Sequence, residues 1–277
     1  MTVVVTGASG FVGRTLVQHL RDQHITVVAV SRRLIPGGWQ VRDYADSPAG
    51  DVVIHLADTA DRTQANALGD AAVQEAVRVS AALSRRFCGR LVYSSSSVVY
   101  GDQHSAPCAT TAAVECRDTY SRVKIENEAI VLAAGGCVAR LSNLLGRNMA
   151  RHTVVSDIFD QIPGSGPVKV RDASPVRDFL SVTDAAAALR ALAVSQLSGV
   201  FNVGSGVATS VRELAETALA VAGQGDRAVV ATAPTGRRSY NVLDIAQTCL
   251  ALAWRPERTL HDDLARLLDE RNHMAHE

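Results

Sequence analysis

The chain has 277 residues, with 28 Lys and Arg against 28 Asp and Glu and 47% hydrophobic residues, so its net charge is zero and its apolar content is too high for intrinsic disorder. A neutral chain has no overall basic field to attract nucleic acid or an anionic membrane, and no apolar run approaches the roughly 18 residues that span a bilayer. The sequence shows no signal peptide, and its five cysteines form no CxxC pair, which predicts a cytoplasmic protein. Its eight histidines show no metal-ligand spacing, so no metal site is expected.

The first half of the chain alternates short β-branched runs with helical stretches. Strands are expected at residues 2–6, 25–30, 52–56, 90–94 and 137–141, and helices at residues 11–22, 71–87 and 120–134. Parallel strands joined by helices of this length need right-handed crossovers. The pattern therefore predicts an α/β fold with a Rossmann-type, doubly wound parallel sheet.

The pattern loosens after Gly146, where residues 162–167 have the composition of a loop. Residues 176–182, a helix from Asp184 and a strand at 199–203 are expected to return to the main layer. The tail is expected to hold a helix at 211–222, a strand at 227–231 and a helix at 260–270. We therefore expect a dinucleotide-binding domain of residues 1–145 and 176–204. Residues 146–175 and 205–277 would form a small C-terminal α/β substrate-binding cap.

A glycine-rich loop joins the first predicted strand to the first helix. Gly7 permits a tight turn, Gly10 lets backbone N–H groups approach a pyrophosphate, and Gly13 lets the helix pack closely on the strand. The helix N-terminus adds a partial positive charge that suits phosphate. The loop is therefore a candidate dinucleotide site, although a tight turn without a ligand would have the same spacing. The candidate cofactor-binding residues of this loop are Gly7, Ser9, Gly10, Phe11, Val12 and Gly13.

The residues after the second strand bear on which dinucleotide binds. An acidic residue there binds the ribose 2′-hydroxyl of NAD, whereas arginine accommodates the 2′-phosphate of NADP. This chain has Ser31, Arg32 and Arg33 and no carboxylate. NADP(H) is therefore favoured and NAD(H) stays possible, because the two arginines could equally be solvated surface charges.

A candidate catalytic group lies further along the chain. Tyr120 and Lys124 are one helical turn apart on the same face, and an ammonium beside a phenol favours the phenolate form. A serine-rich strand end, residues 93–101, precedes them and would place hydroxyl groups at the carboxyl edge of the sheet. These residues suit proton transfer to or from a ligand at that edge.

With these motifs the sequence resembles the extended short-chain dehydrogenases/reductases, the NAD(P)-dependent epimerase/dehydratase group that acts on nucleotide sugars. The resemblance covers nearly the whole chain, and its landmarks occur in the family's order. They are TGASGFVG at 6–13, HLA at 55–57, YSSSSVVYG at 93–101, YSRVK at 120–124, RLSNLLG at 140–146, RDFLSVTD at 177–184 and FNVGSG at 201–206.

The resemblance implies that Tyr120 is the acid/base, that Lys124 holds the nicotinamide ribose and tunes the tyrosine, and that Ser96 hydrogen-bonds the reacting oxygen. Structural roles are favoured for Ser95 and Ser97, although Ser97 is also a candidate substrate contact. By the same resemblance, the remaining candidate residues are Leu56 and Ala57 for the cofactor, and Asn143, Arg177 and Arg237 or Arg238 for the substrate diphosphate. A buried salt bridge to Asp178 or Asp184 is the alternative role for Arg177. The family often dimerises through two helices, here residues 71–87 and 120–134, so a homodimer is possible.

The chain departs from the family pattern at several positions. Thr119 replaces the usual proline before the tyrosine, and Asp58 stands where a small residue is usual, close to the expected cofactor path. The family's asparagine in the helix before the serine strand has no clear counterpart, Gln74 being the nearest. The segment between Gly146 and Arg177 is short, which predicts a small substrate lid.

These features together favour an NAD(P)-dependent reductase of a keto group, most readily a 4-keto deoxysugar linked to a nucleotide. The alternatives are a nucleotide-sugar 4-epimerase with tightly bound NAD and a ketoreductase of a non-sugar metabolite. A 4,6-dehydratase is not expected, because Ser97 and Val98 replace the acid–base pair that such enzymes need. A non-catalytic dinucleotide sensor is disfavoured, since Ser96, Tyr120 and Lys124 are all present.

Overall fold

A computed structural model describes residues 1–59 and 61–275 of the chain. Its centre is a seven-stranded sheet with the order β11-β6-β5-β4-β1-β2-β3, in which every neighbouring pair is parallel. The strands are β1 (Thr2–Thr6), β2 (Thr26–Ser31), β3 (Trp39–Gln40), β4 (Val52–His55), β5 (Leu91–Ser96), β6 (Cys137–Leu141) and β11 (Gly199–Val203). The order reverses at β1, which confirms the predicted Rossmann-type, doubly wound parallel sheet.

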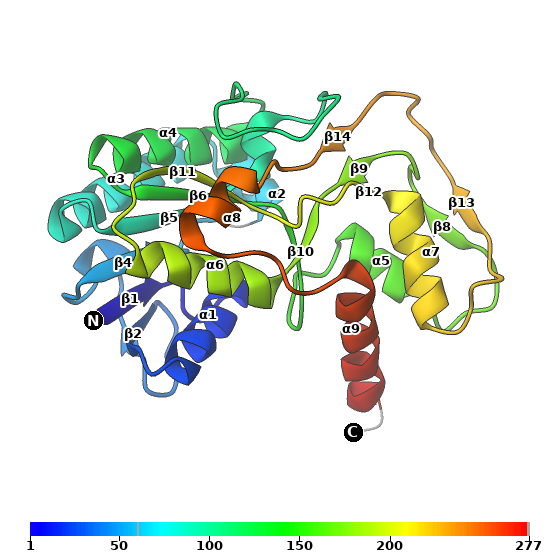
Figure 1. Ribbon diagram of the computed structural model, residues 1–277, viewed down its shortest axis with the longest axis horizontal. Helices are drawn as coiled ribbons and strands as arrows, with labels where there is room; N and C mark the ends of the chain where they lie inside the picture. The colour runs from blue at the N-terminus through cyan, green and yellow to red at the C-terminus, as the bar shows by residue number, and fades with distance from the viewer. Residues whose placement is uncertain (60, 276–277) are drawn as a thin grey trace.

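Helices cover both faces of this sheet, α3 (Asp70–Phe87) and α4 (Thr119–Ala133) on one and α1 (Phe11–Asp22) and α6 (Val182–Val194) on the other (Figure 1). Successive side chains of a strand point to opposite faces. In β1, Val3 and Val5 therefore pack with the residues of α1 and α6, while Val4 packs with those of α3 and α4. Burial on both faces is why the strands are almost continuously apolar.

A second apolar core lies at the other end of the molecule, to the right in Figure 1. It is built by α5 (Val154–Phe159), α7 (Val211–Val221) and α9 (Leu260–Ala275), together with the parallel pair β8 (Val168–Val170) and β13 (Val229–Ala231). Leu214 of α7 and Leu264 of α9 are fully buried in this core.

Residues 176–182 do not join the main sheet, so the prediction of a strand returning there is wrong for this segment. It forms β9 (Val176–Arg177), between β12 (Thr209–Ser210) and β14 (Tyr240–Asn241), and then β10 (Phe179–Ser181), which pairs with β7 (Asn143–Leu145). The buried carboxylate of Asp178 separates the two strands and accepts hydrogen bonds from the N–H groups of Ser205, Gly206 and Leu243. Its side chain therefore ties together loops that are distant in the sequence.

The short helices α2 (Arg62–Leu68) and α8 (Ala246–Leu252) complete the fold. Cys249 and Leu252 of α8, with Trp254, pack in the core between the main sheet and helices α1 and α6. They belong to the range 205–277, which was expected in the cap. The division into two domains stays a prediction. Among the described residues, no helix combines the length and the apolar character required to cross a membrane.

Candidate active site

A cleft of about 550 Å³ opens at the carboxyl ends of β1, β2, β4 and β5. Ligands of open parallel sheets bind at this edge, next to the point where the strand order reverses. The cleft brings together most of the residues expected to bind the dinucleotide and to act on the substrate. Its lining includes Gly7, Ser9, Gly10, Phe11, Val12, Gly13, Arg32, Arg33, Leu56, Ala57, Ser96, Tyr120 and Lys124.

The glycine-rich loop fits a pyrophosphate. Gly7 has a φ of +72°, which L side chains rarely adopt, and a Cβ on Gly13 would lie 2.2 Å from the carbonyl oxygen of Gly7. No side chain caps the N-terminus of α1, where Gly10 is the cap residue, and its first turn holds no acidic residue. The first N–H groups of α1 are thus available to an anion in the cleft, as a bound dinucleotide would require.

The end of β2 forms a second part of the cleft. The hydroxyl of Ser31 donates to Ser9 Oγ at 2.9 Å and accepts from the N–H of Arg33 at 3.0 Å, which joins this strand end to the glycine-rich loop. Ser31 itself is buried and does not line the cleft. The guanidinium of Arg32 lies 5.5 Å from the centre of the Tyr44 ring. Two cations and an aromatic ring are therefore available to the adenosine half of a dinucleotide.

The third part of the cleft holds Ser96, Tyr120 and Lys124. Ser96 ends β5 and accepts from the N–H of Val98 at 3.3 Å, so its hydroxyl stands where the strand turns into a single 3₁₀ turn. Asp118 caps α4 through the N–H of Ser121, which fixes the start of the helix that carries Tyr120 and Lys124. Lys124 Nζ lies 5.8 Å from the centre of the Tyr120 ring.

Lys124 has a carboxylate partner, Asp58. Lys124 Nζ donates to Asp58 Oδ2 at 2.9 Å and to the carbonyl oxygen of Ser94 at 2.8 Å, which leaves one of its three N–H groups for a ligand. Burial alone would raise the pKa of Asp58, but the charge of Lys124 and a hydrogen bond from the Tyr93 hydroxyl bring it below its ordinary value. The pKa of Lys124 is raised, because the attraction of Asp58 outweighs burial. Both groups are charged at neutral pH.

A second buried ion pair, between Arg140 and Glu128, lies next to this part of the site. The guanidinium of Arg140, on β6, donates to Glu128 of α4 at 2.6 Å and 3.0 Å. The hydroxyl of Ser95 donates to the same carboxylate, and the guanidinium lies 4.7 Å from the centre of the Tyr100 ring. This network fixes α4 against the strand end that carries Ser96.

Two of the expected substrate contacts lie outside the cleft. Ser97 is buried, and its carbonyl oxygen accepts from Asn241 Nδ2 at 2.9 Å. Asn143 Nδ2 donates to the carbonyl oxygen of Asp178 at 3.0 Å, while its neighbours Ser142 and Leu144 line the cleft. Because side chains alternate along a strand, the side chain of Asn143 points to the face opposite that of Ser142 and Leu144, which line the cleft.

The expected arginines lie on and beside β9 and β14. Arg177 donates to the carbonyl oxygen of Val176 at 2.8 Å and to Ser239 Oγ at 2.8 Å, and within the described residues it has no carboxylate partner at ion-pair distance, neither Asp178 nor Asp184. Burial lowers the pKa of Arg177, and the nearby charge of Arg237 adds to this. Arg238 is exposed. Arg177, Arg237 and Arg238 do not line the cleft.

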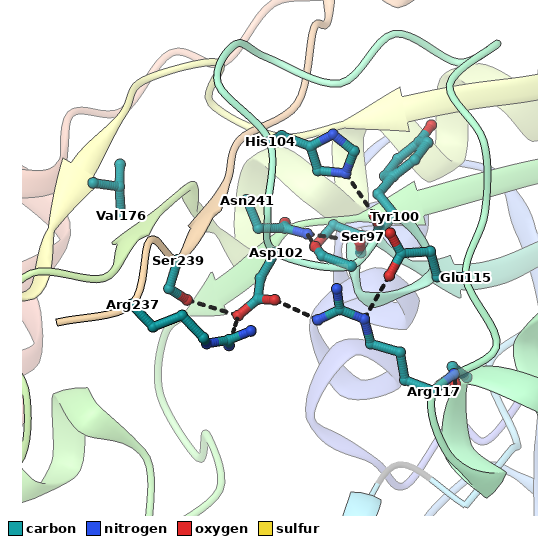
Figure 2. Close-up of polar contacts among 12 residues, drawn as sticks. Ser97, Tyr100, Asp102, His104, Glu115, Arg117, Val176, Arg237, Ser239 and Asn241 are labelled. Carbon is teal, nitrogen blue, oxygen red and sulfur yellow. Dashed lines mark hydrogen bonds and ion pairs between the residues drawn. The ribbon is translucent and has the colours of Figure 1, made fainter. Parts of the chain in front are cut away.

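Arg237 is paired with Asp102 at 2.7 Å. Figure 2 shows Asp102 between Arg117 on one side and Arg237 with Ser239 on the other. The pKa of Asp102 is lowered, because the hydrogen bonds from Ser239 and Arg117 and the charge of Arg237 outweigh burial. This contact joins the segment before β14 to the loop that follows Tyr100.

Several residues of the cleft were not expected from the sequence. Tyr44, Ser142, Leu144, Met149, Ala150 and Thr153 belong to this group. Tyr44 reaches the cleft from a 3₁₀ turn that no periodic pattern marks, and Thr153 from the N-terminus of α5. Thr153 begins a Thr-x-x-Ser capping box, a signal that could have revealed this helix within the segment 146–175.

Comparisons with known proteins identify chains that are similar to this one. Residues 3–204 match the family model described as the NAD dependent epimerase/dehydratase family. The chain is 28% identical to a GDP-6-deoxy-D-mannose reductase from Pseudomonas aeruginosa over 96% of this chain and 95% of the relative. It is 26% identical to a dTDP-6-deoxy-L-talose 4-dehydrogenase (NAD(P)(+)) from Kitasatospora kifunensis, over 96% and 94% of the two chains. The solved structure of RMD from Pseudomonas aeruginosa complexed with NADPH matches with a TM-score of 0.84 and 25% identity, covering 99% of each chain.

Proposed function

Because the chain belongs to the NAD dependent epimerase/dehydratase family and is an NAD(P)-dependent enzyme of the short-chain dehydrogenase/reductase type, we propose that it reduces a keto group on a nucleotide-linked sugar. The preferred substrate is a 4-keto deoxysugar and the preferred cofactor is NADPH. The observation that carries this proposal is one cleft with Ser96, Tyr120 and Lys124 at one end and Arg32 and Arg33 at the other. The two relatives, a nucleotide-sugar reductase and a nucleotide-sugar 4-dehydrogenase, support the same substrate class.

Each part of the cleft has a task in this reaction. The N–H groups of Phe11, Val12 and Gly13 would bind the pyrophosphate, and Arg32 and Arg33 would bind the 2′-phosphate. Bound NADPH supplies the hydride that reduces the carbonyl carbon.

The residues at the other end of the cleft handle the carbonyl oxygen and its proton. Ser96 holds the carbonyl oxygen by a hydrogen bond, and Tyr120 donates a proton to it, so that the keto group becomes a hydroxyl. The resulting phenolate recovers its proton from solvent. Lys124 would use its remaining N–H to orient the nicotinamide ribose.

The substrate diphosphate would bind near Arg177 and Arg237. Arg177 has no carboxylate partner among the described residues, so its charge can be neutralised by a phosphate. Arg237 would do the same if it exchanged Asp102 for the substrate. Arg177 lies on β9 and Arg237 shortly before β14, and these two strands are neighbours in one three-stranded sheet (Figure 1).

The test is to mix the purified protein with NADPH and a panel of nucleotide-linked 4-keto sugars and to follow the loss of NADPH. Turnover with one of these sugars is expected, and Tyr120→Phe should lower kcat about 100- to 10,000-fold while NADPH still binds. Interconversion of sugar epimers without added cofactor would overturn the proposal in favour of an epimerase. Reduction of a non-sugar ketone with no affinity for a nucleoside diphosphate would overturn the substrate class.

A further inference from the structure

Asp58 is the one acidic residue among the described residues that line the cleft, and the reaction proposed above gives it no task. It follows β4 at the carboxyl edge of the sheet, and its side chain is 4% exposed. Its carboxylate faces Lys124 from α4, Tyr93 from β5 and His55 from β4. Burying a carboxylate costs free energy unless partners compensate for it, and here the ammonium of Lys124 and the hydroxyl of Tyr93 do so.

The charges around Asp58 sum to zero. Asp58 and Lys124 are opposite charges 2.9 Å apart. Burial lowers the pKa of His55 and raises that of Tyr93, so both of these groups are neutral. Asp58 Oδ1 has no hydrogen-bond partner in the described structure and lies 3.7 Å from His55 Nε2. The end of the cleft that holds Tyr120 therefore contains a neutral pair instead of a lone ammonium.

This end of the cleft is where a nicotinamide ring must lie. Hydride and proton have to reach the two atoms of one carbonyl bond, and Ser96 and Tyr120 hold the oxygen. The oxidised ring carries one positive charge more than the reduced ring. A lone ammonium beside it would disfavour the oxidised form, and a neutral pair does so much less.

We propose that Asp58 is a positioning residue that shifts the equilibrium between the enzyme-bound reactants and products towards reduction, because it cancels the charge of Lys124 and makes the bound dinucleotide a better hydride donor. This inference rests on the proposed function and deepens it. On the enzyme, this charge cancellation favours hydride transfer from the bound dinucleotide to a keto group over the reverse transfer from an alcohol.

The expected size of the effect follows from Coulomb's law. At an effective dielectric constant near 20, removing one unit charge that acts over about 10–15 Å changes a binding constant roughly five- to fifteenfold. The quantity to measure is the ratio of the dissociation constants of NADP⁺ and NADPH, which needs no sugar. The NAD⁺ and NADH ratio is measured in parallel.

Asp58→Asn keeps the shape of the side chain and removes its charge, and Asp58→Ala serves if the first variant does not fold. We expect the ratio of the NADP⁺ to the NADPH dissociation constant to rise roughly five- to fifteenfold in either variant. Tyr93→Phe removes a hydrogen bond to Asp58 but leaves its charge, so the ratio should change less than about twofold. The double variant Asp58→Asn with Lys124→Met restores neutrality and should return the ratio towards that of the unaltered protein.

An unchanged ratio in Asp58→Asn would overturn the inference, and so would an equal change in Tyr93→Phe, which would indicate a packing effect. A failure of the double variant to restore the ratio would also overturn it. These outcomes are separate from the proposed function. If the ratio shifts in Asp58→Asn but the protein reduces no keto sugar, the role of Asp58 is supported and the substrate class is refuted. If the protein reduces a keto sugar but the ratio does not shift, the substrate class is supported and the role of Asp58 is refuted.

Discussion

The ion pair between Glu128 and Arg140 gives a stability prediction whose size follows from the structure. The two side chains are 5% and 6% exposed, and the closest contact between them is 2.6 Å. Glu128→Leu would leave the guanidinium of Arg140 buried with one remaining acceptor, the carbonyl oxygen of Thr110 at 3.2 Å. Breaking one half of a buried pair costs about 3–5 kcal/mol, a large share of the free energy of unfolding of a domain.

Removing both charges should cost less than removing one. In the double variant Glu128→Leu with Arg140→Met, no unpaired charge stays buried, so we expect the free energy of unfolding to recover by about 2 kcal/mol or more relative to Glu128→Leu. Urea unfolding of the single and double variants measures these differences. The reasoning would be refuted if Glu128→Leu lowered the free energy of unfolding by less than about 1 kcal/mol. It would also be refuted if the double variant lost as much free energy of unfolding as Glu128→Leu and Arg140→Met lose together.

Three further predictions concern the cleft and the C-terminal helix. Gly13→Ala places a Cβ 2.2 Å from the Gly7 oxygen, so it should cost about 1–3 kcal/mol in urea unfolding and weaken NADPH binding at least about tenfold in a fluorescence titration. Replacing both Arg32 and Arg33 by Ser should weaken NADPH binding about 10- to 100-fold and leave NADH binding within about threefold, measured by the same titration. Burial raises the pKa of Asp263 to about 6 in the folded protein, so its stabilising protonated form is lost as pH rises from about 4 to about 6. Asp263→Asn should therefore leave the free energy of unfolding nearly unchanged near pH 4 and raise it by about 2–3 kcal/mol near pH 7.

Each of these predictions has an outcome that contradicts it. A Gly13→Ala protein that binds NADPH normally would show that the loop can move to accept the methyl group. Equal losses of NADPH and NADH affinity in the double arginine variant would mean that the arginines bind no 2′-phosphate. An equal effect of Asp263→Asn at both pH values would mean that the carboxyl group does not titrate near pH 6 in the folded protein.

The main sheet could be predicted because its information is local. Each strand of the first half is a short apolar run and each helix an amphipathic stretch of ordinary length, so β1, α1 and β6 lie where the pattern places them. The prediction that residues 176–182 return to the main sheet was wrong for the opposite reason. Their apolar character permits a strand, but the partner of that strand is chosen by contacts distant in the sequence, above all by the buried carboxylate of Asp178.

The charge balance of the sequence predicted no large polyanionic partner, and this stays a prediction. The glycine spacing and the Tyr120–Lys124 turn predicted the kind of chemistry, because both depend on residues a few positions apart. Only the tertiary structure decided which charges meet. It pairs Lys124 with Asp58 across 66 residues and Arg237 with Asp102 across 135, and it turns Asn143 away from the cleft that its neighbours line. The energy of a charge depends on its nearest partners and on its burial, and the packing of the whole chain determines both.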